Sequence, residues 1–304
     1  MDAYIGPNNQ YRRKESPMKK HWSTILLILI FLIGLSLVLY PTVSNWWNQT
    51  RSSKVISDYS ELVAELDDDT YQQMWSQAVA YNESRAGLAN PYLLTPEQQQ
   101  TYQQVLNLDG NGVMGYIEIP SLGVSLPVYH TVNEEILQVA VGHLDWSDLP
   151  VGGQGTHCVL SGHRGLPSAK LFTDLDDLRV GDTFMLRILD GLLTYEVDKI
   201  LIVEPHQVDD LRQVPGQDLC TLVTCTPYGI NTHRLLVRGH RVENTPEAEI
   251  VRVTANAIPL DPLIVAVIVA IPMMLIAVAL LITGSNLRQQ KARRRQRIEK
   301  FRSR

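Results

Sequence analysis

Two long uncharged runs interrupt the mixed polar pattern of the chain. The first covers residues 22–40 and the second covers residues 262–283. About 20 consecutive apolar residues span the hydrocarbon core of a bilayer as a helix. Basic side chains precede the first run and follow the second, and such residues favour the cytoplasmic side of a membrane. The pattern predicts two transmembrane helices, both termini in the cytoplasm, and the intervening chain outside the cell.

Each run has a soluble or cleaved alternative. A signal peptide would have an apolar stretch of roughly 7–15 residues and a small-residue cleavage site, whereas the first run is longer and lacks a clear site. Trp46 and Trp47 are instead typical of an anchor at the membrane interface. A buried core helix is the alternative for the second run. Pro272 and the basic residues at 291–297 favour a membrane helix there.

The external part changes its pattern near Gly110. Residues 48–108 are polar and helix-prone, and apolar positions at helical spacing predict a helix across 57–87. The motif Asn90-Pro91-Tyr92 interrupts this pattern, and a second helical piece is expected at about 96–106. The external helical region is therefore placed at 41–111.

Short runs rich in Val, Ile, Leu, Thr and Tyr follow from residue 112, separated by Gly, Pro, Asp and Asn. Seven or eight short strands at this spacing predict a mainly β fold, either a closed barrel or a sandwich, over 112–245. A linker at 246–261 then leads to the second membrane segment, and a tail at 284–304 completes the chain.

Charge is strongly segregated, although the net value is only -5. Residues 1–21 contain five basic and two acidic side chains, and residues 288–304 contain nine basic and one acidic. The basic tail directly follows a predicted membrane span, so contact with anionic lipid is favoured over nucleic acid as its partner. The acidic middle could attract lysine-rich proteins, but such surfaces more often keep a protein soluble.

Three cysteines are present: Cys158, Cys220 and Cys225. Cys220 and Cys225 lie five apart on one predicted strand, so their side chains should point to opposite faces. Cys158 and Cys220 stand within apolar runs and are expected to be small core residues, although a bond between them is possible. Cys225 ends an apolar run, and catalytic groups are commonly presented at such strand ends.

A cysteine nucleophile needs a base and an oxyanion donor. His163 also stands at a strand end, before a Gly-Leu-Pro turn, and is the candidate base. Arg234 begins the strand after the Cys225 loop and is the candidate donor. Arg238 shares its face but lies deeper, and His233 is an alternative base on the opposite face. The other histidines are expected to be structural.

The segments TLVTCTPYGINTHRLLVRGHR and SGHRGLPSAKLFTDLDDLRVGD resemble the signature regions of sortases, the cysteine transpeptidases of Gram-positive cell surfaces. The resemblance continues over residues 50–245 in the family order. It implies the closed sortase-type barrel, with Cys225 as nucleophile, His163 as general acid and base, and Arg234 as oxyanion stabiliser.

Three further features resemble class C, the pilin-polymerising sortases: the helical extension, the hydrophobic C-terminal segment and the segment around residues 86–95. In that class an Asp-Pro-aromatic lid covers the active site, and its Asp pairs with the catalytic Arg. Here the corresponding residues are Asn90, Pro91 and Tyr92. An Asn side chain cannot form an ion pair with Arg234, which puts that bridge in doubt.

The resemblance implies cleavage of a Leu-Pro-x-Thr-Gly-like signal between Thr and Gly. Transfer of the acyl group to a lysine amine of another pilin would follow. An anchoring enzyme that uses a cell-wall precursor amine is the alternative, and a non-catalytic surface binding protein is a second. The sequence contains no HExxH, Walker or EF-hand motif, so no metal or other cofactor is expected. The expected location is the cell membrane, with the catalytic barrel outside.

Overall fold

The computed structural model describes residues 22–88 and 91–245, together with the isolated positions 271, 298 and 302. Asn90 of the predicted lid lies outside the described residues. So do the predicted linker and, apart from those isolated positions, the second membrane segment and the basic tail. The chain divides into two compact units, residues 1–41 and 42–304, and the features below belong to the second unless stated otherwise.

The first helix, α1 (Trp22–Ala64), contains the first predicted membrane segment. It is the one helix among the described residues that is long and apolar enough to cross a membrane. Its large apolar side chains are exposed, as at Leu37 (71%) and Val38 (74%). The helix does not end at Tyr40 as predicted but continues through Pro41.

The part of α1 after Pro41 packs on the barrel. Ile56 and Tyr59 are buried with Val113 and Tyr116. The Tyr59 hydroxyl donates to the carbonyl of Met114 at 2.8 Å and accepts from the Leu189 amide at 2.8 Å. These contacts join α1 to two separate parts of the barrel, which is a tertiary reason for the helix to extend so far.

The predicted helix across 57–87 is broken at residues 65–67, and α2 (Asp68–Arg85) begins anew. The side chain of Asp67 caps α2 by accepting from the Thr70 amide at 2.7 Å. Acidic N-caps stabilise a new helix start, which explains the break. The second predicted piece is confirmed as α3 (Pro96–Gln104), with a capping box between Thr95 and Gln98.

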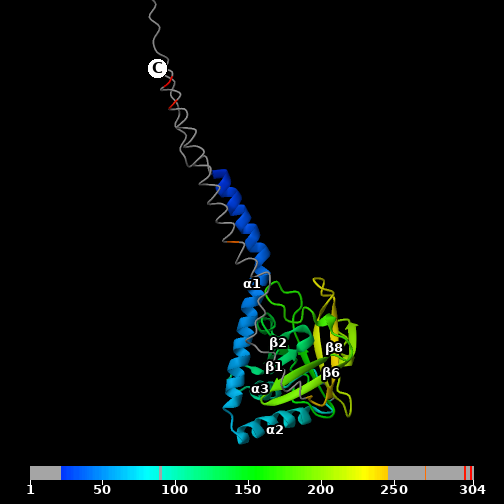
Figure 1. The fold of residues 1–304 in the computed structure, drawn as a ribbon. Helices are drawn as coiled ribbons and strands as arrows, with labels where there is room; N and C mark the ends of the chain where they lie inside the picture. Colours follow the sequence, from blue (N-terminus) through cyan, green and yellow to red (C-terminus); the bar gives the residue numbers. More distant parts are fainter. Residues whose placement is uncertain (1–21, 89–90, 246–270, 272–297, 299–301, 303–304) are drawn as a thin grey trace, which may run out of the picture. The chain divides into compact units, whose positions relative to one another are not determined.

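Eight strands form a closed barrel (Figure 1), which confirms the barrel and settles the strand number. Their order around the barrel is β1-β2-β3-β4-β7-β8-β6-β5. The three-residue strand β3 was not predicted from the sequence. The strands are β1 (Val113–Ile119), β2 (Val124–His130), β3 (Val141–His143), β4 (Thr156–Ser161), β5 (Thr183–Ile188), β6 (Gly191–Val203), β7 (Asp218–Thr226) and β8 (His233–Val242).

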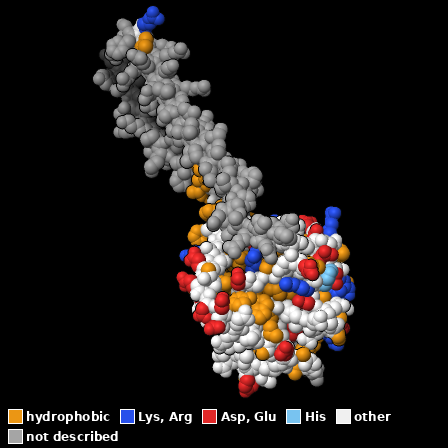
Figure 2. Space-filling view, turned by 60° about the horizontal axis from the view of Figure 1, so that its bottom comes forward, with side chains coloured by type: hydrophobic (Ala, Val, Ile, Leu, Met, Phe, Trp, Pro, Cys, Tyr) orange, Lys and Arg blue, Asp and Glu red, His pale blue; other side chains and the backbone are white. Residues whose placement is uncertain are grey.

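Short helices lie in the loops: η2 (Pro120–Leu122), α4 (Glu134–Leu137), η3 (Leu175–Asp177) and η4 (Asp209–Leu211). One side of each strand fills the barrel with a large apolar cluster, to which α2 and α3 add Ala78, Tyr81 and Tyr102. Acidic and basic side chains are interspersed over the face seen in Figure 2. That arrangement favours a solubilising role for the net negative charge.

Candidate active site

Two parallel strands bring His163 and Cys225 to the same edge of the barrel. Strand β4 pairs in parallel with β7, and Ser161 is the register partner of Val223. His163 and Cys225 each follow these partners by two residues. The intervening Gly162 donates its amide to the Val223 carbonyl at 3.1 Å and accepts at its carbonyl from the Thr224 hydroxyl at 2.7 Å. The residue before the candidate base is therefore tied to the strand that carries the candidate nucleophile.

Arg234 enters the same edge from the antiparallel strand β8, where it is the register partner of Cys225. Directly opposed residues on paired strands place their side chains on one face of the sheet. The barrel therefore brings together all three residues that the sequence indicated. The alternative base His233 is the partner of Thr226 instead, and its alternation with Arg234 sends it to the other face.

Strand alternation also separates the site from the barrel core. Leu222 and Leu235 belong to the inner cluster. Val159, Val223 and Leu236 form a second cluster outside the barrel, with Leu211 from η4 and the partly buried Trp146. We call these five residues the outer cluster. Val223 and Cys225 are two apart on β7, so the outer cluster forms an apolar surface that leads along the strand to the candidate nucleophile.

The His163 side chain is 27% exposed. Its Nε2 atom is buried and has no hydrogen-bond partner among the described residues. The Glu134 carboxylate on α4 faces the ring, with Oε2 3.6 Å from Nε2. The imidazole is thus held in a site that retains a free ring nitrogen, as proton transfer requires.

Arg234 and Arg238 differ in their partners. Arg238 makes a bidentate ion pair with Asp198 at 3.0 and 2.7 Å. Arg234 donates Nη1 to the His233 carbonyl at 3.1 Å, and no carboxylate pairs with it within residues 22–88 and 91–245. Its remaining donors are available to an incoming anionic group, so Arg234 is favoured over Arg238 as oxyanion donor.

The loops after His163 and Cys225 also contact each other. The guanidinium of Arg164 stands 5.9 Å from the centroid of the Tyr228 ring and pairs with Asp176. Gly165 has a φ of +75°, and a Cβ atom there would lie 3.0 Å from the Tyr228 ring. This close approach requires glycine, and it fixes the spacing between the two loops.

The remaining cysteines and histidines have structural surroundings. Cys158 and Cys220 are free, buried and opposite each other on β4 and β7. Cys220 lies in the core and Cys225 at the rim, as their odd separation predicted. Burial lowers the pKa of His143 to about 3, and it also lowers the pKa values of His130 and His157. No cluster of three or more metal-ligating side chains occurs in the described part of the chain.

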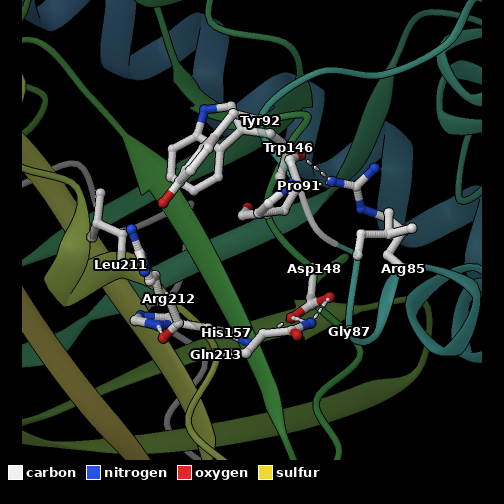
Figure 3. Close-up of a pocket in the computed structure, with 12 residues that line it drawn as sticks. Arg85, Gly87, Pro91, Tyr92, Trp146, Asp148, His157, Leu211, Arg212 and Gln213 are labelled. Carbon is white, nitrogen blue, oxygen red and sulfur yellow. Dashed lines mark hydrogen bonds between the residues drawn. The ribbon is translucent and has the colours of Figure 1, made fainter.

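A cavity of about 260 Å³ lies beside the outer cluster, between the predicted lid and the loop that contains η4. Figure 3 shows the rings of Tyr92 and Trp146 overlapping on one side of the cavity, with Arg212 below them. The two aromatic rings meet edge to face with centroids 5.1 Å apart. Tyr92 thus contacts the outer cluster through Trp146, and Cys225 itself does not line this cavity.

Arg85, at the end of α2, links the lid to the loop that contains Trp146. Its Nη2 donates to the Pro91 carbonyl at 2.7 Å and to the Trp146 carbonyl at 2.8 Å, as seen in Figure 3. The side chain is only 3% exposed. Buried arginines need such acceptors because an unpaired charge is costly in the interior. Sequence reasoning missed Arg85, because neither carbonyl acceptor has a sequence signature.

Trp146 is the second residue that sequence reasoning did not explain. It follows β3, packs against the other members of the outer cluster and contacts the ring of Tyr92. The loop around it is held by Asp148, whose carboxylate accepts from the His157 amide at 2.7 Å and from Gln213. Burial raises the pKa of Asp148. The bonds from Gln213 to Asp148 therefore tie the β3–β4 connection to the loop before β7.

Comparison with known proteins places these features in a family. A family model described as "Sortase domain" matches residues 117–242. Sortase A of Streptococcus agalactiae is 25% identical over 226 residues, which cover 73% of this chain and 85% of that protein.

Solved structures show a nearer similarity. Sortase C1 from Streptococcus agalactiae is 47% identical, with a TM-score of 0.62. The match covers all of that chain and 63% of this one. Sortase C of Streptococcus pneumoniae is 40% identical, with a TM-score of 0.56, over 98% of that chain and 63% of this one. Because identity at this level extends across whole solved domains, the similarity exceeds a shared fold, and the chain belongs to the sortases, a family of cysteine transpeptidases.

Proposed function

We propose that this sortase is a class C enzyme that polymerises pilins. The main support is its 40–47% identity to solved sortase C structures of two streptococci. The helical extension supports the same class, because α2 and α3 flank a segment whose Tyr92 packs on Trp146 of the outer cluster. The non-catalytic alternative is set aside, because the family is enzymatic.

The convergence of three strand ends supports the assignment of roles. In the proposed first step, the Cys225 thiolate attacks the threonine carbonyl of a Leu-Pro-x-Thr-Gly-like signal. Arg234 donates hydrogen bonds to the resulting oxyanion. The carbon–nitrogen bond to glycine then breaks, and the His163 imidazolium gives its proton to the departing glycine amine. The products are a thioester on Cys225 and a neutral imidazole.

In the second step a lysine amine of another pilin attacks the thioester carbon. His163 takes a proton from the attacking nitrogen, the carbon–sulfur bond breaks and the thiolate is restored. Water competes with the amine for the same thioester. The outer cluster gives the approach to Cys225 an apolar surface, and the lid residues Pro91 and Tyr92 add to it, which would limit hydrolysis.

We further propose the two-span topology, with the barrel outside the cell and both termini in the cytoplasm. Sortases are generally membrane-associated, and α1 supplies one candidate span. The second span, at 262–283, rests on its hydropathy and on the basic tail that follows it. A single cysteine introduced at either terminus of the Cys225→Ala chain should not react with a membrane-impermeant reagent in intact cells, and a reaction at either terminus would contradict the topology.

The catalytic proposal is tested with the full chain in detergent, a Leu-Pro-x-Thr-Gly peptide and a pilin. Mass spectrometry should find an acyl group on Cys225, and gel electrophoresis should show pilin ladders. Both should be lost in Cys225→Ala, whereas Cys158→Ala should retain them because that thiol is buried in the core. Acyl-enzyme without ladders, but with transfer to a cell-wall precursor amine, would favour the anchoring alternative. Equal behaviour of wild type and Cys225→Ala would refute a role of this thiol.

A further inference from the structure

Glu134 lies at the candidate active site without being one of the three residues that the sequence indicated. It begins the short helix α4, which the side chain of Asn133 caps by accepting from the Ile136 amide at 3.0 Å. One carboxylate oxygen, Oε1, accepts a hydrogen bond from Gln138 Nε2. The other, Oε2, faces His163 Nε2 at 3.6 Å. The carboxylate is therefore oriented by its own helix toward the imidazole.

The length of this contact decides between two roles for Glu134. A residue that orients a base does so through a hydrogen bond, and 3.6 Å is too long for one. The side chain of Glu134 is also 70% exposed, so it is open to an incoming group. A carboxylate that is oriented yet uncommitted, beside a base, is suited to receive a cation.

We propose that Glu134 binds the ammonium group of the acceptor lysine beside His163. This inference rests on the proposed acyl transfer and specifies its second substrate as a cationic primary amine. The ammonium carries three protons and the product amide keeps one. One proton passes to water before attack, and His163 takes the second as the new carbon–nitrogen bond forms. The carbon–sulfur bond then breaks, and its electron pair returns to the Cys225 thiolate.

Charge gives this carboxylate a specific effect on the acceptor. An exposed ion pair contributes about 0.2–1 kcal/mol, which corresponds to a change of up to about 5-fold in binding. The attraction should act on a lysine ammonium and not on hydroxylamine, which also cleaves thioesters but is uncharged at neutral pH. The ratio of the two reactions therefore isolates recognition of the cation from chemistry at the thioester.

The test uses the full chain in detergent, acylated with a sorting-signal peptide, and measures the rate constants for a lysine-containing peptide and for hydroxylamine. Glu134→Gln should lower the ratio of lysine to hydroxylamine reactivity about 2- to 5-fold. Glu135→Gln is the matched control, since Glu135 is the next residue on the same helix and is exposed. Its ratio should equal that of the wild type. High salt should shrink the difference between the two variants.

Four outcomes separate failure of this proposal from failure of the proposed function. A ratio that is the same in all three proteins overturns the proposal. An equal loss of both reactions in Glu134→Gln also overturns it, and assigns Glu134 to positioning His163. If the wild type forms no acyl-enzyme at all, the proposed function has failed. If acyl-enzyme forms and hydroxylamine releases it while the ratio is unchanged, only the role of Glu134 has failed.

Discussion

Replacing Arg85 by methionine should release the lid segment from the end of α2. Methionine keeps a long apolar side chain in the space that Arg85 occupies and removes every hydrogen-bond donor. The carbonyls of Pro91 and Trp146 then lose bonds of 2.7 and 2.8 Å. Both border the cavity, so water can replace the guanidinium there, and the barrel itself should remain folded.

The expected change in the open population of the lid follows from the Arg85 hydrogen bond that the lid loses. A hydrogen bond from a charged donor contributes about 1.5–3 kcal/mol. Of the two bonds that the Arg85 side chain donates, the one to Pro91 joins α2 to the lid, so the open population of the lid should rise by about 10- to 150-fold. The global free energy of unfolding should fall by less than the contribution of two such bonds. Arg85 is only 3% exposed, so its removal also removes the cost of burying its charge.

Two measurements follow the opening. Amide hydrogen exchange should accelerate at residues 92–94, and alkylation of Cys225 should become faster if the lid limits access to it. Arg179→Met is the matched control, since Arg179 is an exposed arginine that belongs neither to the lid nor to the outer cluster. The reasoning is wrong if Arg85→Met leaves exchange in the lid at the wild-type rate while its melting temperature shows an intact fold.

Two further predictions concern the loop contact and the buried histidines. Gly165→Ala should slow acyl-enzyme formation several-fold, because its Cβ would lie 3.0 Å from the Tyr228 ring at a φ of +75°. Adding Tyr228→Ala to the same chain should recover part of the lost rate. A double variant that is no faster than Gly165→Ala would contradict a clash with the ring. Burial lowers the pKa of His143 to about 3, so the unfolded chain binds the extra proton first and the native state loses about 2 kcal/mol between pH 6.5 and 4.5. Asp148, with a pKa raised by burial, acts in the opposite direction at lower pH, and a stability that stays flat over this range would count against the His143 prediction.

The sequence predicted elements whose signals are local. Apolar runs bounded by turn residues located seven of the eight strands, and strand-end positions selected His163, Cys225 and Arg234. The missing strand, β3, has only three residues, too few to show a period of two. The break between α1 and α2 was missed because helical spacing continues through it, and only the capping geometry of Asp67 separates the helices.

The sequence could not predict contacts whose partners are far apart in the chain. Arg85 and the carbonyl of Trp146 are separated by 61 positions, and the acceptor is a backbone atom that any residue could supply. Glu134 looks like an ordinary solvated residue at the start of a helix until the β2–β3 connection brings it to His163. Trp146 had no assigned role, because the outer cluster it joins is assembled from three strands and η4.

Cys220 and Cys225 show how parity along one strand separates a structural thiol from a candidate nucleophile. Cys220 points inward, opposite Gly239 and beside Cys158, where the barrel leaves it 0% exposed. Five residues later the strand has alternated to the outer face and reached its end, so Cys225 meets Arg234 across the ladder and the His163 loop alongside. Shifting the register of β7 by one residue would exchange inner and outer faces along the whole strand. The ladder bonds that hold β7 between β4 and β8 therefore determine which thiol can react, as directly as any residue in the site.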